Sequence, residues 1–132
     1  MSAGQRSYDA LTIEAFERGD IDVEAFDHEA HVFAAWRFVS EMPLPEAIER
    51  FSGALKRLTQ SLGVPGKYHG TVTWFYMLLI AERQRPNQDW AAFRKSNADL
   101  FARDLLSRYY TAEVLGSDEA RTGFVLPDRI AA

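Results

Sequence analysis

Hydrophobic residues recur at intervals of three and four along most of the chain, and no segment sustains a strict alternation of polar and apolar residues. The first spacing is typical of helices that bury one face, whereas alternation would indicate half-buried strands. Proline and glycine divide the sequence into short blocks, as expected for helices joined by turns. The pattern predicts an all-α fold, in which residues 1–132 form a single compact helical bundle of five or six helices.

The expected helices are bounded by proline, glycine and capping residues. Asp27 suits the N-cap of the second helix, and Pro45 suits the first turn of the third. Phe51 and Leu55 fall on the apolar face of the third helix and are expected in the core. Residues 71–84 are apolar all round, so this helix is expected at the centre of the bundle. The expected segments are residues 8–18, 27–40, 44–62, 71–84 and 87–110, with Ser96 as a candidate break in the last, and a short turn after Ser117.

Length and composition narrow the class of protein further. The chain has 132 residues, a mass of 15.0 kDa and 47% hydrophobic residues, which fits one soluble domain with one core. The longest wholly apolar run, residues 74–81, is far shorter than the roughly 18 residues of a membrane-spanning helix. The N-terminus has no apolar stretch typical of a secretory signal. We therefore expect a cytoplasmic protein that has no membrane partner.

Charge and the lack of cysteine exclude several kinds of chemistry. Without cysteine, the chain has no disulfide, zinc–thiolate or iron–sulfur site and no thiol nucleophile, so any metal would need histidine and carboxylate ligands. The net charge is -4 and the pI about 5.3, with basic residues dispersed among acidic ones. This distribution offers no basic surface for a phosphate backbone, so nucleic acid is not an expected partner.

All three histidines lie in two short motifs, Asp27-His28-Glu-Ala-His31 and Lys67-Tyr68-His69. A spacing of three places His28 and His31 next to each other on one helix face, where both imidazoles reach one ion. His69 precedes the apolar helix, whose dipole favours the neutral imidazole that a metal requires. The three histidines therefore form a candidate site for a divalent metal ion, namely zinc, iron or copper.

Other side chains near these motifs complete the candidate site. One helical turn before His28, Glu24 is placed to act as a fourth ligand or as a hydrogen-bond acceptor for a ligand histidine. Asp27 is the alternative candidate for the hydrogen-bond acceptor. The candidate catalytic residues are Glu24, Asp27, Tyr68, Thr71 and Thr73, and the candidate pocket walls are Trp36 and Trp74.

A purely structural role for the histidines competes with this hypothesis. With three histidines in the chain, a pair at helical spacing arises by chance in roughly one chain in ten. A histidine inside a core is usually only hydrogen-bonded. Familiar catalytic motifs are lacking: residues 63–67 have neither the spacing nor the hydroxyl of a phosphate-binding loop, and the Glu-x-x-His pairs of di-iron bundles are missing.

The chain also resembles a group of small uncharacterised bacterial helical proteins. The resemblance covers most of the chain and implies that the two histidine motifs belong together, but it implies no reaction. It is carried by Phe26-x-His28-x-x-His31, Ala35-Trp36, Lys67-Tyr68-His69 with Thr71 and Thr73, Tyr109-Tyr110, Ser117, Ala120-Arg121 and Pro127-Asp128.

Three functions remain open from the sequence. The first is a metal-dependent enzyme that acts on a small-molecule substrate, either by hydrolysis through a metal-bound water or by oxygen chemistry with iron or copper. The second is a non-catalytic helical module that binds a small molecule or a partner protein. The third is a subunit of a hetero-oligomer, and assembly into homo-oligomers is equally open.

Overall fold

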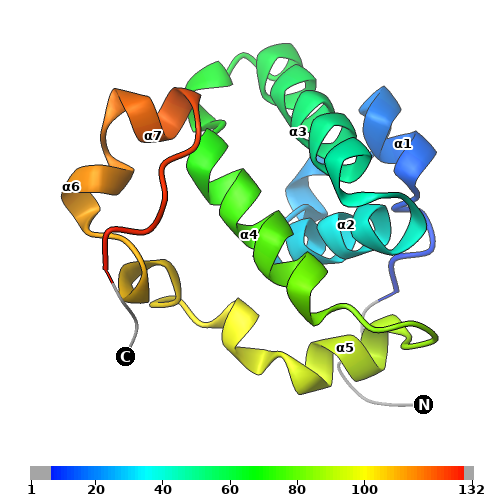
Figure 1. Cartoon of the computed structure of the whole chain (residues 1–132). Helices are drawn as coiled ribbons and strands as arrows, with labels where there is room; N and C mark the ends of the chain where they lie inside the picture. The colour runs from blue at the N-terminus through cyan, green and yellow to red at the C-terminus, as the bar shows by residue number, and fades with distance from the viewer. Residues whose placement is uncertain (1–6, 130–132) are drawn as a thin grey trace.

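The computed structural model describes residues 7–129, and every regular element within them is a helix, which confirms the expected all-α class (Figure 1). The α-helices are α1 (Ile13–Arg18), α2 (His28–Glu41), α3 (Leu44–Ser61), α4 (Gly70–Arg83), α5 (Trp90–Ser96), α6 (Ala112–Leu115) and α7 (Asp118–Thr122). Short 3₁₀ helices lie between them: η1 (Val23–Ala25), η2 (Pro65–Lys67), η3 (Ala98–Phe101) and η4 (Leu106–Arg108). None of the helices in this described part of the chain is long and apolar enough to cross a membrane.

Side-chain caps set where most of the α-helices begin. The Asp27 carboxylate accepts a hydrogen bond of 3.1 Å from the backbone N–H of Ala30, as expected for the N-cap of α2. At the start of α3, Pro45 stands in the first turn, where its missing N–H costs nothing. Four further helices have a hydroxyl or carboxylate cap of the same kind: Thr12, Asp89, Thr111 and Ser117.

The helical segment expected over residues 87–110, with a candidate break at Ser96, is divided into α5, η3 and η4. The side-chain amide of Asn97 donates a hydrogen bond of 2.9 Å to the carbonyl of Phe93, at the end of α5. A local bond of this kind competes with the helical backbone ladder. The break therefore falls one residue beyond the expected Ser96.

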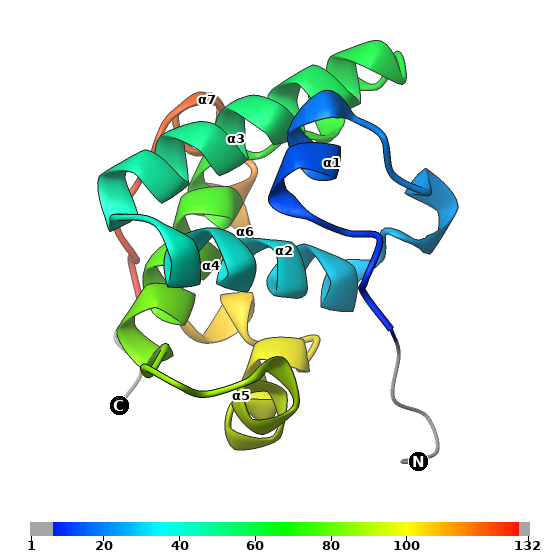
Figure 2. The ribbon, with the colours of Figure 1, turned by 90° about the vertical axis from the view of Figure 1, so that its right-hand side faces the viewer.

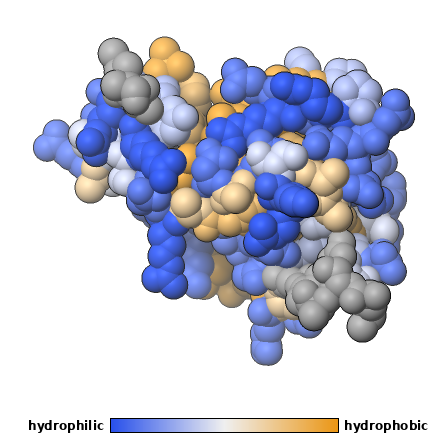
Figure 3. Space-filling view, turned by 90° about the horizontal axis from the view of Figure 1, so that it is seen from below, coloured by the Kyte–Doolittle hydropathy of each residue, from blue (hydrophilic) through white to orange (hydrophobic). Residues whose placement is uncertain are grey.

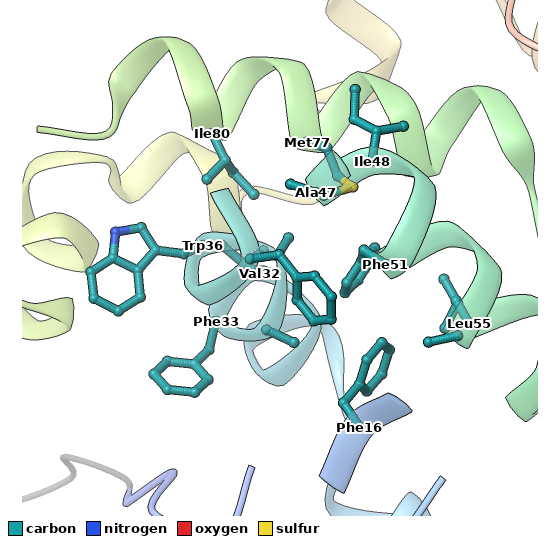
Figure 4. Packing of buried hydrophobic residues seen from close by; sticks show 14 of the residues in the cluster. Phe16, Val32, Phe33, Trp36, Ala47, Ile48, Phe51, Leu55, Met77 and Ile80 are labelled. Carbon is teal, nitrogen blue, oxygen red and sulfur yellow. The ribbon is translucent and has the colours of Figure 1, made fainter. Parts of the chain in front are cut away.

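The core forms where α1, α2, α3 and α4 meet (Figure 4). The Phe16 ring of α1 stacks on the Phe51 ring of α3, with 5.1 Å between centroids. Met77 and Ile80 of α4 are fully buried against this cluster. Phe51 and Leu55 are both buried, which confirms their expected place in the core.

The apolar helix α4 lies at the centre of the arrangement, in contact with α2, α3 and α7 (Figures 1 and 2). It is not buried all round, however. Trp74 and Leu78 keep 38% and 37% of their surface exposed. They are four residues apart and so share the face of α4 that points away from α2. The molecular surface seen in Figure 3 is mostly hydrophilic, with hydrophobic patches between the polar side chains.

The chain after α7 packs against the first turn of α4. The Thr71 hydroxyl donates to the carbonyl of Gly123 at 3.3 Å and accepts from the N–H of Val125 at 3.0 Å. Gly70 makes this approach possible, because a Cβ at that position would stand 2.5 Å from the Gly123 carbonyl oxygen. The backbone itself therefore requires glycine at the start of α4.

We expect Gly70→Ala to lower the free energy of unfolding by about 1–3 kcal/mol, because the added methyl group displaces the segment that carries Gly123. Urea denaturation measures the change. Gly66→Ala is the matched control, since a Cβ there meets no atom within 4 Å and Gly66 has no positive φ. Equal stability of the two variants would contradict the close approach.

Candidate functional site

The three histidines line one cavity of about 150 Å³ between α2, α3 and α4, beside η2. The rest of its wall is largely aliphatic and aromatic, with Leu55 and Phe51 of α3 facing Met77 and Ile80 of α4. The polar lining residues are His28, His31, Lys67, His69, Thr73 and Tyr76. The fold thus brings together two motifs that lie about forty residues apart in the sequence.

His28 is the first residue of α2, and its side chain closes one side of the pocket. Its Nε2 lies 2.9 Å from the carbonyl oxygen of Leu100, so this nitrogen carries the proton and donates. Its other ring nitrogen, Nδ1, has no hydrogen-bond partner among the described residues. The ring meets the Tyr76 ring edge to face, with 5.2 Å between centroids.

His31 lies nearly one turn further along α2, with its ring against Phe26 at a centroid distance of 4.1 Å. Within residues 7–129, neither of its ring nitrogens has a hydrogen-bond partner. The pKa of His31 is lowered to about 4: burial is the largest cause, the nearby His28 adds to the lowering, and Asp27 opposes it. At neutral pH the pocket therefore contains an uncharged imidazole with one free donor and one free acceptor.

His69 has a structural role at the entrance of α4. Its Nδ1 accepts the backbone N–H of Val72 at 3.2 Å, which makes it the N-cap of the helix. Its Nε2 donates to the carbonyl of Leu115 in α6 at 2.7 Å. Both ring nitrogens are therefore engaged by the protein, and the imidazole ties the start of α4 to α6.

These contacts decide how well the histidines fit a metal ion. With both nitrogens engaged, His69 has no lone pair left to bind a metal. Across the described part of the chain, no three histidine or carboxylate side chains are grouped so as to hold an ion. The donor set, as arranged, does not fit the expected three-histidine metal site, and we derive no chemical step from zinc, iron or copper.

The three candidate hydroxyls lie in different surroundings. Thr73 lines the pocket, but its hydroxyl donates to the His69 carbonyl at 2.8 Å. Thr71 is fully buried and holds the C-terminal segment, outside the pocket. Tyr68 lines a separate hollow; burial raises its pKa, and hydrogen bonds with Thr73 and Ser52 oppose the rise. Only Thr73 belongs to the histidine-lined pocket.

The candidate carboxylates do not line the pocket either. Asp27 uses a carboxylate oxygen to cap α2, and its charge favours protonated His31. Glu24 is exposed in η1, where its backbone N–H bonds to Asp22. Because residues 23–25 form a 3₁₀ turn and not an extension of α2, Glu24 does not project between His28 and His31.

Trp36 and Trp74 were expected to wall the pocket, and the structure corrects this. Trp36 lies about 100° around α2 from the lining residue Ala35, and it packs against Trp90 of α5 at 5.6 Å. Figure 4 shows Trp36 and Leu55 on opposite sides of the labelled cluster. Trp74, on the outer face of α4, stacks on Phe124 and lines a groove along α3.

Sequence reasoning missed Tyr76 and Leu55 as pocket residues and gave Lys67 no role of its own. The signal for Tyr76 was present, because Val72, Thr73 and Tyr76 recur at helical spacing and so share one face of α4. Which of several apolar faces borders a cavity depends on the packing of three helices, and no single helix pattern carries that information.

Comparison of the chain with protein-family models, with curated proteins and with solved structures gave no match in any of the three. The resemblance to small bacterial helical proteins accordingly stays a prediction. The function has to be argued from the geometry of the pocket.

We expect His69→Ala to lower the free energy of unfolding by about 1–2 kcal/mol, because the N-cap of α4 is lost. His69→Asn is the matched control, since an asparagine side chain also accepts from the N–H at this position and should restore much of the loss. Denaturant titration measures both variants. If His69→Ala is as stable as wild type and instead loses a bound metal ion seen by elemental analysis, the residue is a ligand and not a cap.

The low pKa of His31 makes stability depend on pH. Unfolded His31 takes up a proton near its ordinary pKa of 6.5, whereas the folded protein resists protonation down to about 4. Stability should therefore be fully present above about pH 6.5 and fall by up to about 3 kcal/mol as the pH drops to about 4.

Replacing the imidazole by a group that does not titrate tests this dependence. The free energy of unfolding of wild type and of His31→Gln is measured by denaturation across that pH range. It should fall less in the variant, because all other titrating groups are common to both proteins. Parallel curves for the two proteins would show that His31 is not buried in a neutral form.

Proposed function

We propose that the protein is a non-catalytic binding module for a small, largely apolar molecule held in the pocket of His28, His31 and His69. The observation that carries the proposal is His31, whose half-buried and neutral imidazole lines the pocket and has no hydrogen-bond partner among the described residues. In a largely apolar pocket this ring offers a ligand one hydrogen-bond donor and one acceptor, which a ligand with a polar edge can use and a purely apolar ligand cannot.

The size of the pocket limits the ligand. About 150 Å³ is close to the volume of an engineered apolar cavity that admits benzene. Sites for larger ligands usually begin at roughly 300 Å³. A single ring or a short branched chain fits this volume, whereas a nucleotide, flavin or haem does not.

The charge of the lining limits the ligand as well. No aspartate or glutamate of the described part of the chain lines the pocket, and Lys67 contributes a positive charge at its exposed rim. A cationic ligand would therefore lose hydration without gaining a partner. A neutral or weakly acidic ring, such as a phenol, is matched in polarity, because its hydroxyl donates to the bare nitrogen of His31.

The same features favour binding over catalysis. A general base works best when its pKa lies near the working pH, and a pKa of about 4 makes His31 a weak base at neutral pH. The metal-dependent enzyme expected from the sequence requires His69 as a ligand, and His69 already has two protein partners.

Three ring compounds of similar size test the proposal: benzene, phenol and the cation benzylammonium. In titrations followed by NMR, we expect phenol to bind more tightly than benzene and benzylammonium not to bind. The advantage of phenol should disappear in His31→Leu, which keeps the pocket apolar but removes the acceptor. Failure of both benzene and phenol to bind wild type would overturn the proposal.

A matched pair of core variants on α3 tests whether the ring compounds bind in the histidine-lined pocket. Leu55 lines the pocket and Leu58 does not, although both are buried leucines of one helix. Each change to alanine should cost about 2–5 kcal/mol of stability. Only Leu55→Ala should enlarge the pocket and admit a larger ring such as naphthalene. Binding of naphthalene to Leu58→Ala as well would show that the ring compounds bind elsewhere.

A further inference from the structure

A second hollow, of about 340 Å³, lies where α3, η2 and α7 meet. Its two charged residues are Lys56 of α3 and Arg121 of α7, which are 65 positions apart in the sequence. Among residues 7–129, no aspartate or glutamate lines this hollow. The chain has a net charge of -4, so acidic residues outnumber basic ones. A surface hollow lined by two basic residues and no acidic residue differs from that average.

Both cations are held in place by uncharged groups. The Lys56 ammonium lies 5.2 Å from the centre of the Tyr68 ring, within the range of a cation–π contact. One Nη atom of Arg121 donates to the carbonyl oxygen of Gly66 at 2.5 Å. Neither cation has a carboxylate partner within the described part of the chain. Their positions are thus constrained, while their charges are not neutralised.

Most other arginines in the described residues differ in this respect. A carboxylate lies within 4.0 Å of each of six: Arg18, Arg37, Arg50, Arg83, Arg94 and Arg108. The pair of Arg83 with Asp99 has N–O distances of 2.6 and 2.9 Å and shows the bidentate geometry in which a guanidinium binds an oxyanion through two hydrogen bonds. Arg121 has N–H donors for such a bidentate pair but no carboxylate acceptor among the described residues.

The neighbouring polar groups add one more free donor. The hydroxyls of Thr59 and Thr122 already donate to backbone carbonyls of their own helices, at 2.9 and 2.8 Å. The side-chain amide of Gln60 also lines the hollow and has no hydrogen bond among the described residues. Lys56, Gln60 and Arg121, from two different helices, therefore line one hollow, and none of them has a carboxylate partner among the described residues.

We propose that this hollow binds a phosphate group, either as inorganic phosphate or as the terminal phosphate of a monoester. A tetrahedral dianion offers oxygens in several directions, so it accepts from all three donors at once and neutralises both cations. No residue lines both this hollow and the histidine-lined pocket, so the proposal stands independently of the ring-binding function.

Titration with inorganic phosphate, followed by amide NMR shifts at constant ionic strength, tests the site. We expect saturable binding in the millimolar range, with shifts at Gly66 and Thr122. Lys56→Gln and Arg121→Gln should each weaken binding about tenfold, since each removes a charge-assisted hydrogen bond. Arg121→Lys keeps the charge and should retain part of the affinity. Lys95→Gln, on exposed α5, is the matched control and should bind as wild type does.

A phosphate monoester and acetate distinguish the ligands. Binding of the monoester at least as tightly as phosphate, with weaker binding of acetate, supports a phosphate site that is open to a larger molecule. Binding of inorganic phosphate alone restricts the site to the free ion. The proposal is overturned if wild type shows no saturable shifts, if Lys95→Gln weakens binding as much as Lys56→Gln, or if only Lys67→Gln abolishes binding, which would move the anion to the rim of the histidine-lined pocket.

Discussion

The start of α4 is held from two sides, and this junction fixes α6 and the segment after α7 against the rest of the bundle. His69 caps the helix and bonds to α6, and Gly70 allows the backbone at Gly123 to approach within a distance that no side chain tolerates. Thr71 adds two hydrogen bonds to the same segment. Three consecutive residues thus join the C-terminal part of the chain to the helix that packs against both α2 and α3. Direct packing of buried side chains holds α4 against α2 and α3, and the pocket lies between these three helices.

The helices and much of the core could be predicted from the sequence because they depend on local patterns. Asp27 and Pro45 mark helix starts by chemistry that acts within one turn, and Phe51 and Leu55 follow the spacing of one helix face. The division of residues 87–110 was predicted only in part, since a single side-chain bond from Asn97 outweighed a helical pattern. The exposure of Trp74 could not be predicted, because it depends on which face of an apolar helix the other elements cover.

The candidate site was predicted in location but not in chemistry. His28, His31 and His69 do lie around one cavity, as their two motifs suggested. Their roles differ because a histidine ring has two nitrogens, and the backbone competes for both. At His69 the Val72 N–H and the Leu115 carbonyl engage both nitrogens, and these partners depend on a turn and on a distant helix. Spacing along the chain shows which imidazoles can meet, but not which lone pairs remain free.

The three histidines form a series in the number of nitrogens that the protein engages: two at His69, one at His28 and none at His31 among the described residues. Engaged nitrogens fix a ring and so shape the wall of the pocket. Free nitrogens leave hydrogen-bonding capacity inside it, and burial keeps that capacity uncharged at His31. A fixed wall combined with one neutral group of free hydrogen-bonding capacity suits the small polar-edged molecule proposed above better than a purely apolar one, because only the former forms a hydrogen bond with that group.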